Sequence, residues 1–108
     1  MKLLKYKGYI GDIQVSIEDD ILHGKLLYLS ALVTYEGRTV DEVKIAFEEA
    51  VDDYLETCKQ KLYQPETPCK GSFNIRIGHD LHLAAMVKAK EMEMSLNEFV
   101  TKSISNQL

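Results

Sequence analysis

The sequence predicts an α+β protein built from two small units. In the first unit, short alternating segments are followed by one long amphipathic segment; in the second, one alternating segment precedes two helical ones. A chain of 108 residues is ordinarily one domain, but the proline-bearing stretch from Tyr63 to Pro68 indicates a connection between two parts. We therefore predict a first domain over residues 1–62, a linker over 63–70 and a second domain over 71–108.

The first unit begins with predicted strands. Residues 9–17 alternate through Ile13, Val15 and Ile17, and residues 18–20 are acidic and typical of a turn. Further strands are predicted over residues 21–29 and 31–35. Together these segments predict an antiparallel meander.

A long helix is predicted after the strands. Thr39 and Glu42 have the spacing of a capping box, which marks a helix start. One apolar stripe then runs for about five turns, through Val43, Ala46, Phe47, Ala50, Val51, Tyr54, Leu55 and Cys58. The helix is therefore expected to lie on the sheet.

The second unit opens with a two-faced strand. Its apolar face carries Phe73, Ile75 and Ile77, and its polar face carries Ser72, Asn74 and Arg76. The polar side chains are of the types that pair with base edges in the major groove, which admits a two-stranded ribbon. A second copy of the chain would supply the other strand, so we predict a DNA-binding homodimer with the apolar face in its core. Alternatively, the polar face only keeps an edge strand in water.

Two helices are predicted after this strand. The first spans about Asp80 to Met92, with apolar residues at helical spacing at positions 81, 85, 89 and 92. The second starts at Ser95-Leu96-Asn97-Glu98, a further capping box, and its apolar stripe comprises Leu96, Phe99, Val100 and Ile104. Because a helix N-terminus attracts anions, we predict that Ser95, Leu96 and Asn97 hold a DNA phosphate.

This strand, helix and capped helix resemble the ribbon-helix-helix repressors. The match rests on residues 72–77 with Ser95-Leu96-Asn97. Nearly the whole chain resembles HicB antitoxins, through the segments Leu22–Lys25, Tyr35–Val43, Ala50–Cys58 and Pro65-Glu66. Two positions depart from such repressors: Gly78-His79 stands where proline is common, and Glu93 stands where glycine is usual. If Glu93 is left-handed, it costs about 1 kcal/mol.

The resemblance implies a partner and a fold. The partner is a small basic RNA-cleaving toxin, HicA, and the first unit is a trimmed relative of the RNase H fold. Residues 1–69 carry 8 Lys/Arg and 13 Asp/Glu, a balance of −5, whereas residues 70–108 carry 5 and 4, a balance of +1. An acidic first unit suits a basic partner, although a solvated acidic surface alone explains the same numbers.

Catalysis and metal binding are not predicted. The acids do not have a recognisable metal-site spacing; they are Asp12, Glu18, Asp19, Asp20, Asp52 and Asp53. His79 and His82 lack further ligands. Cys58 is expected to be a buried thiol and Cys69 an exposed one, with no disulfide. No cofactor is expected.

The sequence thus predicts a cytoplasmic antitoxin of a type II toxin–antitoxin system. It would inhibit a HicA-like toxin RNase and repress its own operon by binding operator DNA, as a homodimer or a higher oligomer. No signal peptide or membrane span is recognised. The alternative is a stand-alone ribbon-helix-helix transcriptional regulator whose first domain binds or senses another partner.

Overall fold

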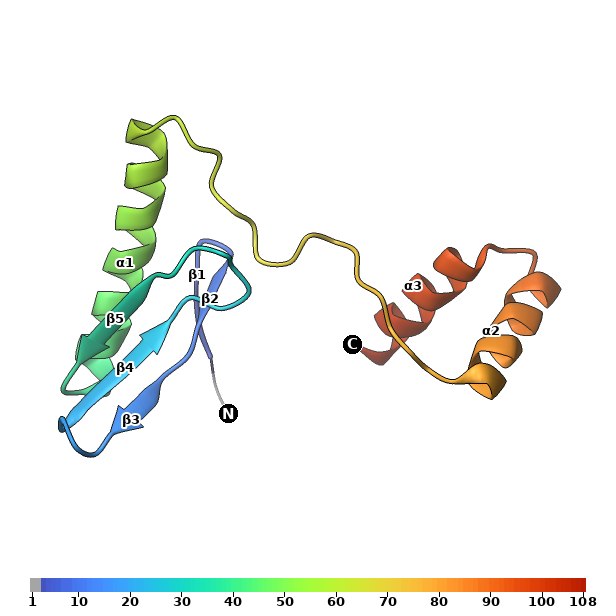
Figure 1. Cartoon of the computed structure of the whole chain (residues 1–108), viewed down its shortest axis with the longest axis horizontal. Coiled ribbons are helices and arrows are strands. Elements are labelled where there is room, and N and C mark those ends of the chain that lie inside the picture. The colour runs from blue at the N-terminus through green and yellow to red at the C-terminus, as the bar shows by residue number, and fades with distance from the viewer. Residues whose placement is uncertain (1–2) are drawn as a thin grey trace. The chain divides into compact units, whose positions relative to one another are not determined.

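The computed structural model describes residues 3–108, which form two compact units that divide between Ser72 and Phe73. Figure 1 shows that the strands and the longest helix belong to the first unit and that two shorter helices make up the second. The predicted α+β class is confirmed.

All strand pairs of the first unit are antiparallel, as the predicted meander requires. β1 pairs with β2, while β4 lies between β3 and β5. The strands are β1 (Leu4–Tyr6), β2 (Tyr9–Gly11), β3 (Gln14–Ser16), β4 (Ile21–Lys25) and β5 (Thr34–Gly37). The strand predicted over residues 21–29 was therefore too long, and the strand predicted over 31–35 was displaced, because residues 28–32 form a loop between β4 and β5.

The strand predicted over residues 9–17 is divided at Asp12 and Ile13, so that prediction was wrong in its extent. The buried Asp12 carboxylate accepts the backbone N–H of Lys25 at 2.9 Å, a bond that a strand carbonyl would ordinarily make. The Asp12 carbonyl instead accepts the Tyr35 hydroxyl at 2.8 Å. A bridge from Gly11 to Leu26 still keeps β2 beside the extension of β4.

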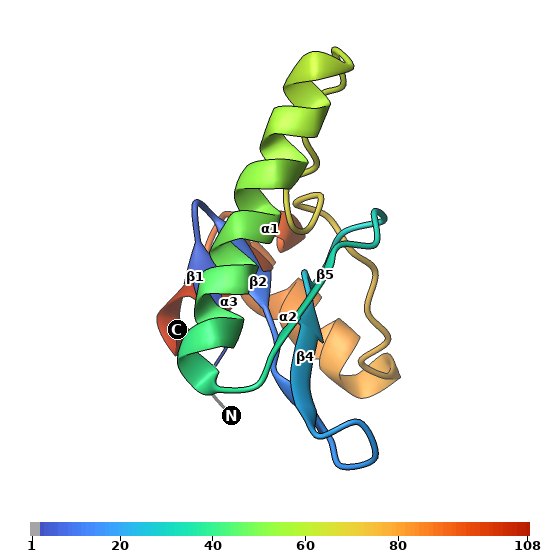
Figure 2. The same ribbon diagram turned by 90° about the vertical axis from the view of Figure 1, so that its left-hand side faces the viewer.

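Helix α1 (Val40–Gln60) begins at the predicted capping box. The Thr39 hydroxyl accepts the Glu42 N–H at 3.1 Å, and the Glu42 carboxylate accepts the Thr39 N–H at 3.0 Å. Figure 2 shows the helix running along the strands of the first unit. The predicted apolar stripe is confirmed, since its members are buried or half-buried.

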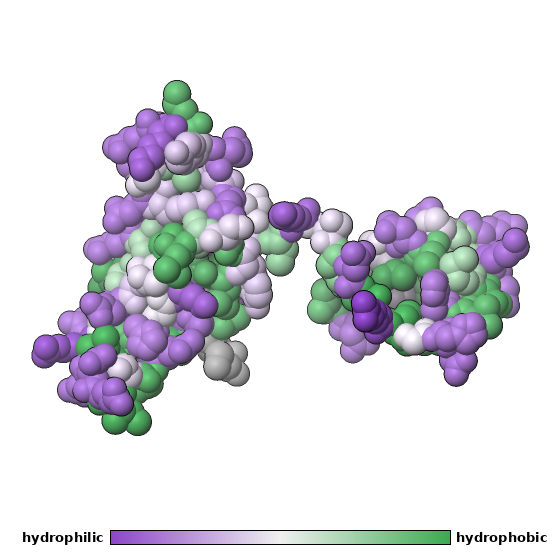
Figure 3. All heavy atoms as spheres, in the orientation of Figure 1, coloured by the Kyte–Doolittle hydropathy of each residue, from purple (hydrophilic) through white to green (hydrophobic). Residues whose placement is uncertain are grey.

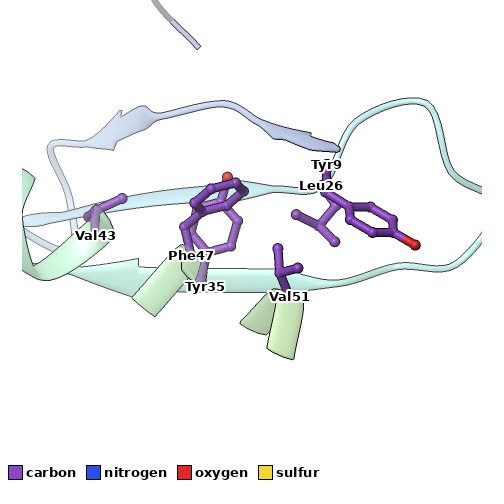
Figure 4. Packing of buried hydrophobic residues seen from close by; sticks show 6 residues of the cluster. All are labelled: Tyr9, Leu26, Tyr35, Val43, Phe47 and Val51. Atoms are coloured by element: carbon purple, nitrogen blue, oxygen red, sulfur yellow. The ribbon is translucent and has the colours of Figure 1, made fainter. Parts of the chain in front are cut away.

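The core of the first unit forms where this stripe meets the sheet (Figure 4). Val43, Phe47 and Val51 are almost completely buried against side chains from the strands. The rings of Phe47 and Tyr35 meet edge to face with centroids 5.4 Å apart, a favourable aromatic geometry. Gly11 is required beneath them, because a Cβ there would lie 2.8 Å from the Phe47 ring.

Two residues of the predicted apolar strand face are not part of this core. Val15 is 68% exposed and Ile17 is 89% exposed. Helix α1 packs mainly on β5, β4 and β1, so that β3 lies beyond its cover. The predicted apolar face was therefore wrong for Val15 and Ile17, whereas Ile13 does pack against the core.

The second unit consists of α2 (His79–Glu91) and α3 (Leu96–Gln107), which pack against each other. Both predicted helices are confirmed. Ser95 caps α3 by accepting the Glu98 N–H at 3.0 Å. The second capping box is only half formed, because the Glu98 carboxylate accepts the Ser95 hydroxyl rather than its N–H.

Candidate nucleic-acid and dimer interface

The segment predicted as the ribbon strand has no strand partner within the described chain. Its apolar side chains are largely uncovered: Phe73 is 73% exposed, Ile75 55% and Ile77 40%. A strand requires a neighbour for its backbone hydrogen bonds, so one chain cannot form the predicted ribbon. The apolar alternation remains in place and lacks only something to cover it.

The polar residues of the same segment are also free to bind. Ser72, Asn74 and Arg76 are exposed, and between residues 3 and 108 their side chains make no hydrogen bond or ion pair. Their donors and acceptors are therefore not committed to holding the fold together.

Helix α2 carries a second set of uncovered apolar residues. Ala89 is the sole buried residue in the described part of the second unit. Meanwhile Leu83, Met86 and Val87 are about half exposed. Figure 3 shows hydrophobic residues at the surface of this unit. A two-helix hairpin with so little buried surface cannot fold stably alone, which indicates a missing partner.

The apolar stripe predicted for α2 did not include these three residues, because it follows only one side of the helix. The helix has apolar side chains on more than one side, as its sequence His79-Asp80-Leu81-His82-Leu83-Ala84-Ala85-Met86-Val87 shows. That pattern is typical of a helix covered on two sides. The predicted stripe itself is only partly covered, since Leu81 and Met92 are exposed whereas Ala85 is half-buried.

The predicted phosphate contact lies at the start of α3. Leu96 and Asn97 are its first two residues, and their backbone N–H groups lack intrahelical acceptors there. The Glu98 carboxylate lies in the same turn, 3.1 Å from the Ser95 hydroxyl. An anion at this end would therefore gain the helix dipole but meet one negative charge.

The second unit is electrically balanced. From residue 73 onward the four cations are Arg76, Lys88, Lys90 and Lys102, and the four anions are Asp80, Glu91, Glu93 and Glu98, which gives zero net charge. Long-range attraction to DNA is correspondingly small for each copy. Binding would depend on well-placed individual contacts.

Glu66, in the predicted linker, is attached to the first unit. Its carboxylate accepts the backbone N–H groups of Ser30 and Ala31 at 2.8 and 2.9 Å. Its own N–H donates to the Tyr54 hydroxyl at 3.0 Å, and its carbonyl accepts the Tyr9 hydroxyl at 2.6 Å. These bonds to the Ser30 and Ala31 N–H groups lower the pKa of the Glu66 carboxyl. The linker predicted over residues 63–70 did not include this attachment, although Pro65-Glu66 is one of the segments that resemble HicB antitoxins.

Two of the acidic residues considered for catalysis, Asp12 and Asp52, make contacts within the fold. The Asp12 carboxylate accepts the Lys25 N–H where the chain divides between β2 and β3. Asp52 forms an ion pair with Lys7 at 2.8 Å. The Lys7 ammonium lowers the pKa of Asp52. Across residues 3–108 no three His, Cys, Asp or Glu side chains are arranged to hold a metal ion. Cys58 is buried and Cys69 exposed, as predicted.

No helix in the described part of the chain is both long and apolar enough to cross a bilayer.

The structure defines a small α+β protein that carries a separate helical unit with an uncovered apolar surface. The family model for the HicB family matches residues 54–104, from the second half of α1 to α3. Over these residues, just under half of the chain, the protein is similar to the HicB family, and this similarity suggests an antitoxin role in a toxin–antitoxin system. No curated protein and no solved structure shows significant similarity.

Proposed function

We propose that the protein is an antitoxin that inhibits a HicA-like RNase with its first unit and represses its own operon with its second. The observation that carries the DNA-binding half is the unpaired 72–77 segment, with apolar and polar side chains on alternate positions and all of them exposed. Pairing with a second copy would cover the apolar set and join two polar sets into one ribbon.

The uncovered surface of α2 supports the same dimer. A ribbon formed by Phe73, Ile75 and Ile77 from two chains needs helices on its apolar face, and Leu83, Met86 and Val87 offer unsatisfied apolar surface for that contact. The interface would complete the core that a single second unit lacks.

The similarity of residues 54–104 to the HicB family supports the toxin half of the proposal. The first unit is closed around its own aromatic core and has an acidic balance, which suits a basic, RNA-binding partner. Its α+β layer is the part that we propose to be a trimmed RNase H-like fold. A stand-alone regulator would use the same second unit without the toxin.

Replacing Asn74 and Arg76 together by alanine tests the DNA contacts. Both side chains are exposed and unbonded within residues 3–108, so the dimer should remain folded. Each lost base contact should weaken operator binding by about 1–3 kcal/mol. The measurement is a gel-shift titration with DNA from upstream of the gene, with Lys102→Ala in the middle of α3 as control. Wild-type affinity in the double variant would refute the assignment.

The toxin half is tested by co-expression with the neighbouring gene product. The full-length chain should form a stable complex with it and suppress its cleavage of RNA. DNA binding without toxin binding would instead support the stand-alone regulator.

A further inference from the structure

The open edge of β3 is the feature of the first unit that the proposed function does not use. β3 is an edge strand in the order β3-β4-β5. β2 precedes β3 in the chain, and β1 pairs with β2 along the same edge only as far as Leu4 opposite Gly11. Beyond Gly11 no strand among residues 3–108 pairs with this edge.

The ladder identifies the backbone groups that are unpaired. The Asp12 N–H donates to the Lys25 carbonyl at 3.3 Å, so Asp12 and Lys25 are a hydrogen-bonded pair. In an antiparallel ladder every second pair of opposite residues is hydrogen-bonded in this way. Gln14 and Ser16, opposite His23 and Ile21, therefore bond to β4. The N–H and carbonyl groups of Ile13 and Val15 consequently face away from β4, toward the open edge.

Side chains next to this edge are apolar and acidic. Val15 and Ile17 are mostly exposed, and Glu18, Asp19 and Asp20 follow them in the turn to β4. None of the three acids is in an ion pair within the described residues. Figure 3 shows hydrophobic and hydrophilic residues close together at this end of the first unit.

We propose that the β3 edge docks an extended strand of the toxin, which adds to the sheet at Ile13 and Val15. This inference rests on the proposed antitoxin function and names the surface that performs it. The bound strand has apolar side chains beside Val15 and Ile17, and Lys or Arg opposite residues 18–20. Backbone pairing supplies affinity and the side chains supply selectivity, as in other cases of strand addition.

Charge argues against a second copy as the occupant. A second copy would bring a first unit with the same acidic balance, and another Glu18, Asp19 and Asp20, to an edge that already carries these three acids. Like charges facing each other across a strand pair are destabilising. A basic strand meets no such penalty.

Val15→Pro in the full-length chain tests the proposal. Proline removes only the outward N–H of Val15, a position that an edge strand tolerates. The matched control is Glu36→Pro on β5, the strand at the opposite edge of the sheet. Because the Leu26 N–H donates to the Val33 carbonyl at 3.0 Å, the alternation of hydrogen-bonded pairs directs the Glu36 N–H away from β4. We expect Val15→Pro to bind purified toxin roughly 10-fold more weakly and Glu36→Pro to bind like wild type.

Amide hydrogen exchange provides a second measurement that needs no variant. The Val15 amide should exchange rapidly in the free chain and become protected in the toxin complex, whereas the Glu36 amide should not change. If the wild-type chain binds toxin but its Val15 amide stays unprotected, this inference is wrong and the antitoxin function still stands. The same conclusion follows if Val15→Pro binds toxin with wild-type affinity. Failure of wild type to bind toxin removes both. Loss of self-association in Val15→Pro without loss of toxin affinity would identify a second copy as the occupant and also overturn the inference.

Discussion

Glu93 shows how a single residue limits the stability of the second unit. It ends α2 with φ of 56°, a left-handed conformation. Its N–H bonds to the Lys90 carbonyl, and the Met94 N–H bonds to the Ala89 carbonyl, which together form a Schellman motif. Glycine is preferred at this position because it has no Cβ to strain.

Glu93→Gly should therefore stabilise the second unit. The relief of left-handed strain exceeds the added entropy of the unfolded glycine by roughly 0.5–1 kcal/mol. Thermal unfolding at a fixed protein concentration measures the gain as a higher Tm. Glu91→Gly, inside the last turn of α2, is the control and should lower the Tm. A lower Tm in Glu93→Gly would contradict the strain argument.

Glu66 is the residue whose protonation should loosen the connecting segment. Bonds from the Ser30 and Ala31 N–H groups hold its folded-state pKa below the ordinary value. A depressed folded pKa means that the stabilisation is fully present above the unfolded pKa and is lost as the pH falls through the folded one.

We expect Glu66→Gln to destabilise the first unit at neutral pH and to have a smaller effect at about pH 3, which lies below the ordinary glutamate pKa of about 4.3. Urea unfolding of both proteins at the two pH values measures this. Glu49→Gln, on the exposed side of α1, is the control and should have little effect at either pH. An equal effect of Glu66→Gln at both pH values would show that its charge is not involved.

At the scale of elements, residues 72–77 can form a β-strand only if another strand pairs with them. Phe73 is mostly exposed in one chain, so alanine there would have little effect on a monomer. In the proposed ribbon it is buried, and its truncation should cost on the order of 2–5 kcal/mol. A monomeric segment and a paired ribbon therefore predict clearly different losses of stability on replacing Phe73 by alanine.

Phe73→Ala should accordingly lower the Tm of the second unit, with a larger loss at low protein concentration, because folding and association are coupled. Calorimetry over a range of concentrations measures both effects. Leu62→Ala, at the exposed end of α1, is the control and should have little influence. A Tm that is independent of concentration in parent and variant would indicate a monomeric tail.

At the scale of the whole molecule, the two units have separate interiors. The first closes a core around Phe47, Tyr35 and Val51, and it extends through Glu66 to Ser72. The second leaves its apolar residues uncovered. The first unit should therefore fold without the second, whereas the second needs a partner.

A fragment of residues 1–72 should inhibit the toxin and fail to bind operator DNA. It keeps the acidic sheet layer and the Glu66 bonds, and it loses only the avidity of the dimer. The measurement is toxin RNase activity titrated with the fragment and with the full-length chain. Inhibition by residues 73–108 alone, with none from a folded fragment, would reverse the proposed division of roles.

Local pattern was sufficient to predict the helices. Capping residues and apolar periodicity lie within a few positions of each other, so Thr39, Ser95 and the stripe of α1 could be recognised without tertiary information. The same applies to the alternation of residues 72–77, although no strand among residues 3–108 pairs with this segment. The sequence by itself therefore determined which segments are helical and which residues share a face.

Tertiary structure alone decided which of those faces are covered. The division of the first long strand depends on Asp12 meeting Lys25 and Tyr35, and the attachment of the connecting segment depends on Glu66 meeting Tyr9, 57 residues earlier. Such contacts join distant positions whose encounter leaves no local signature in the sequence. For the same reason, the exposure of Val15 became visible only once α1 was seen to pack mainly on β5, β4 and β1.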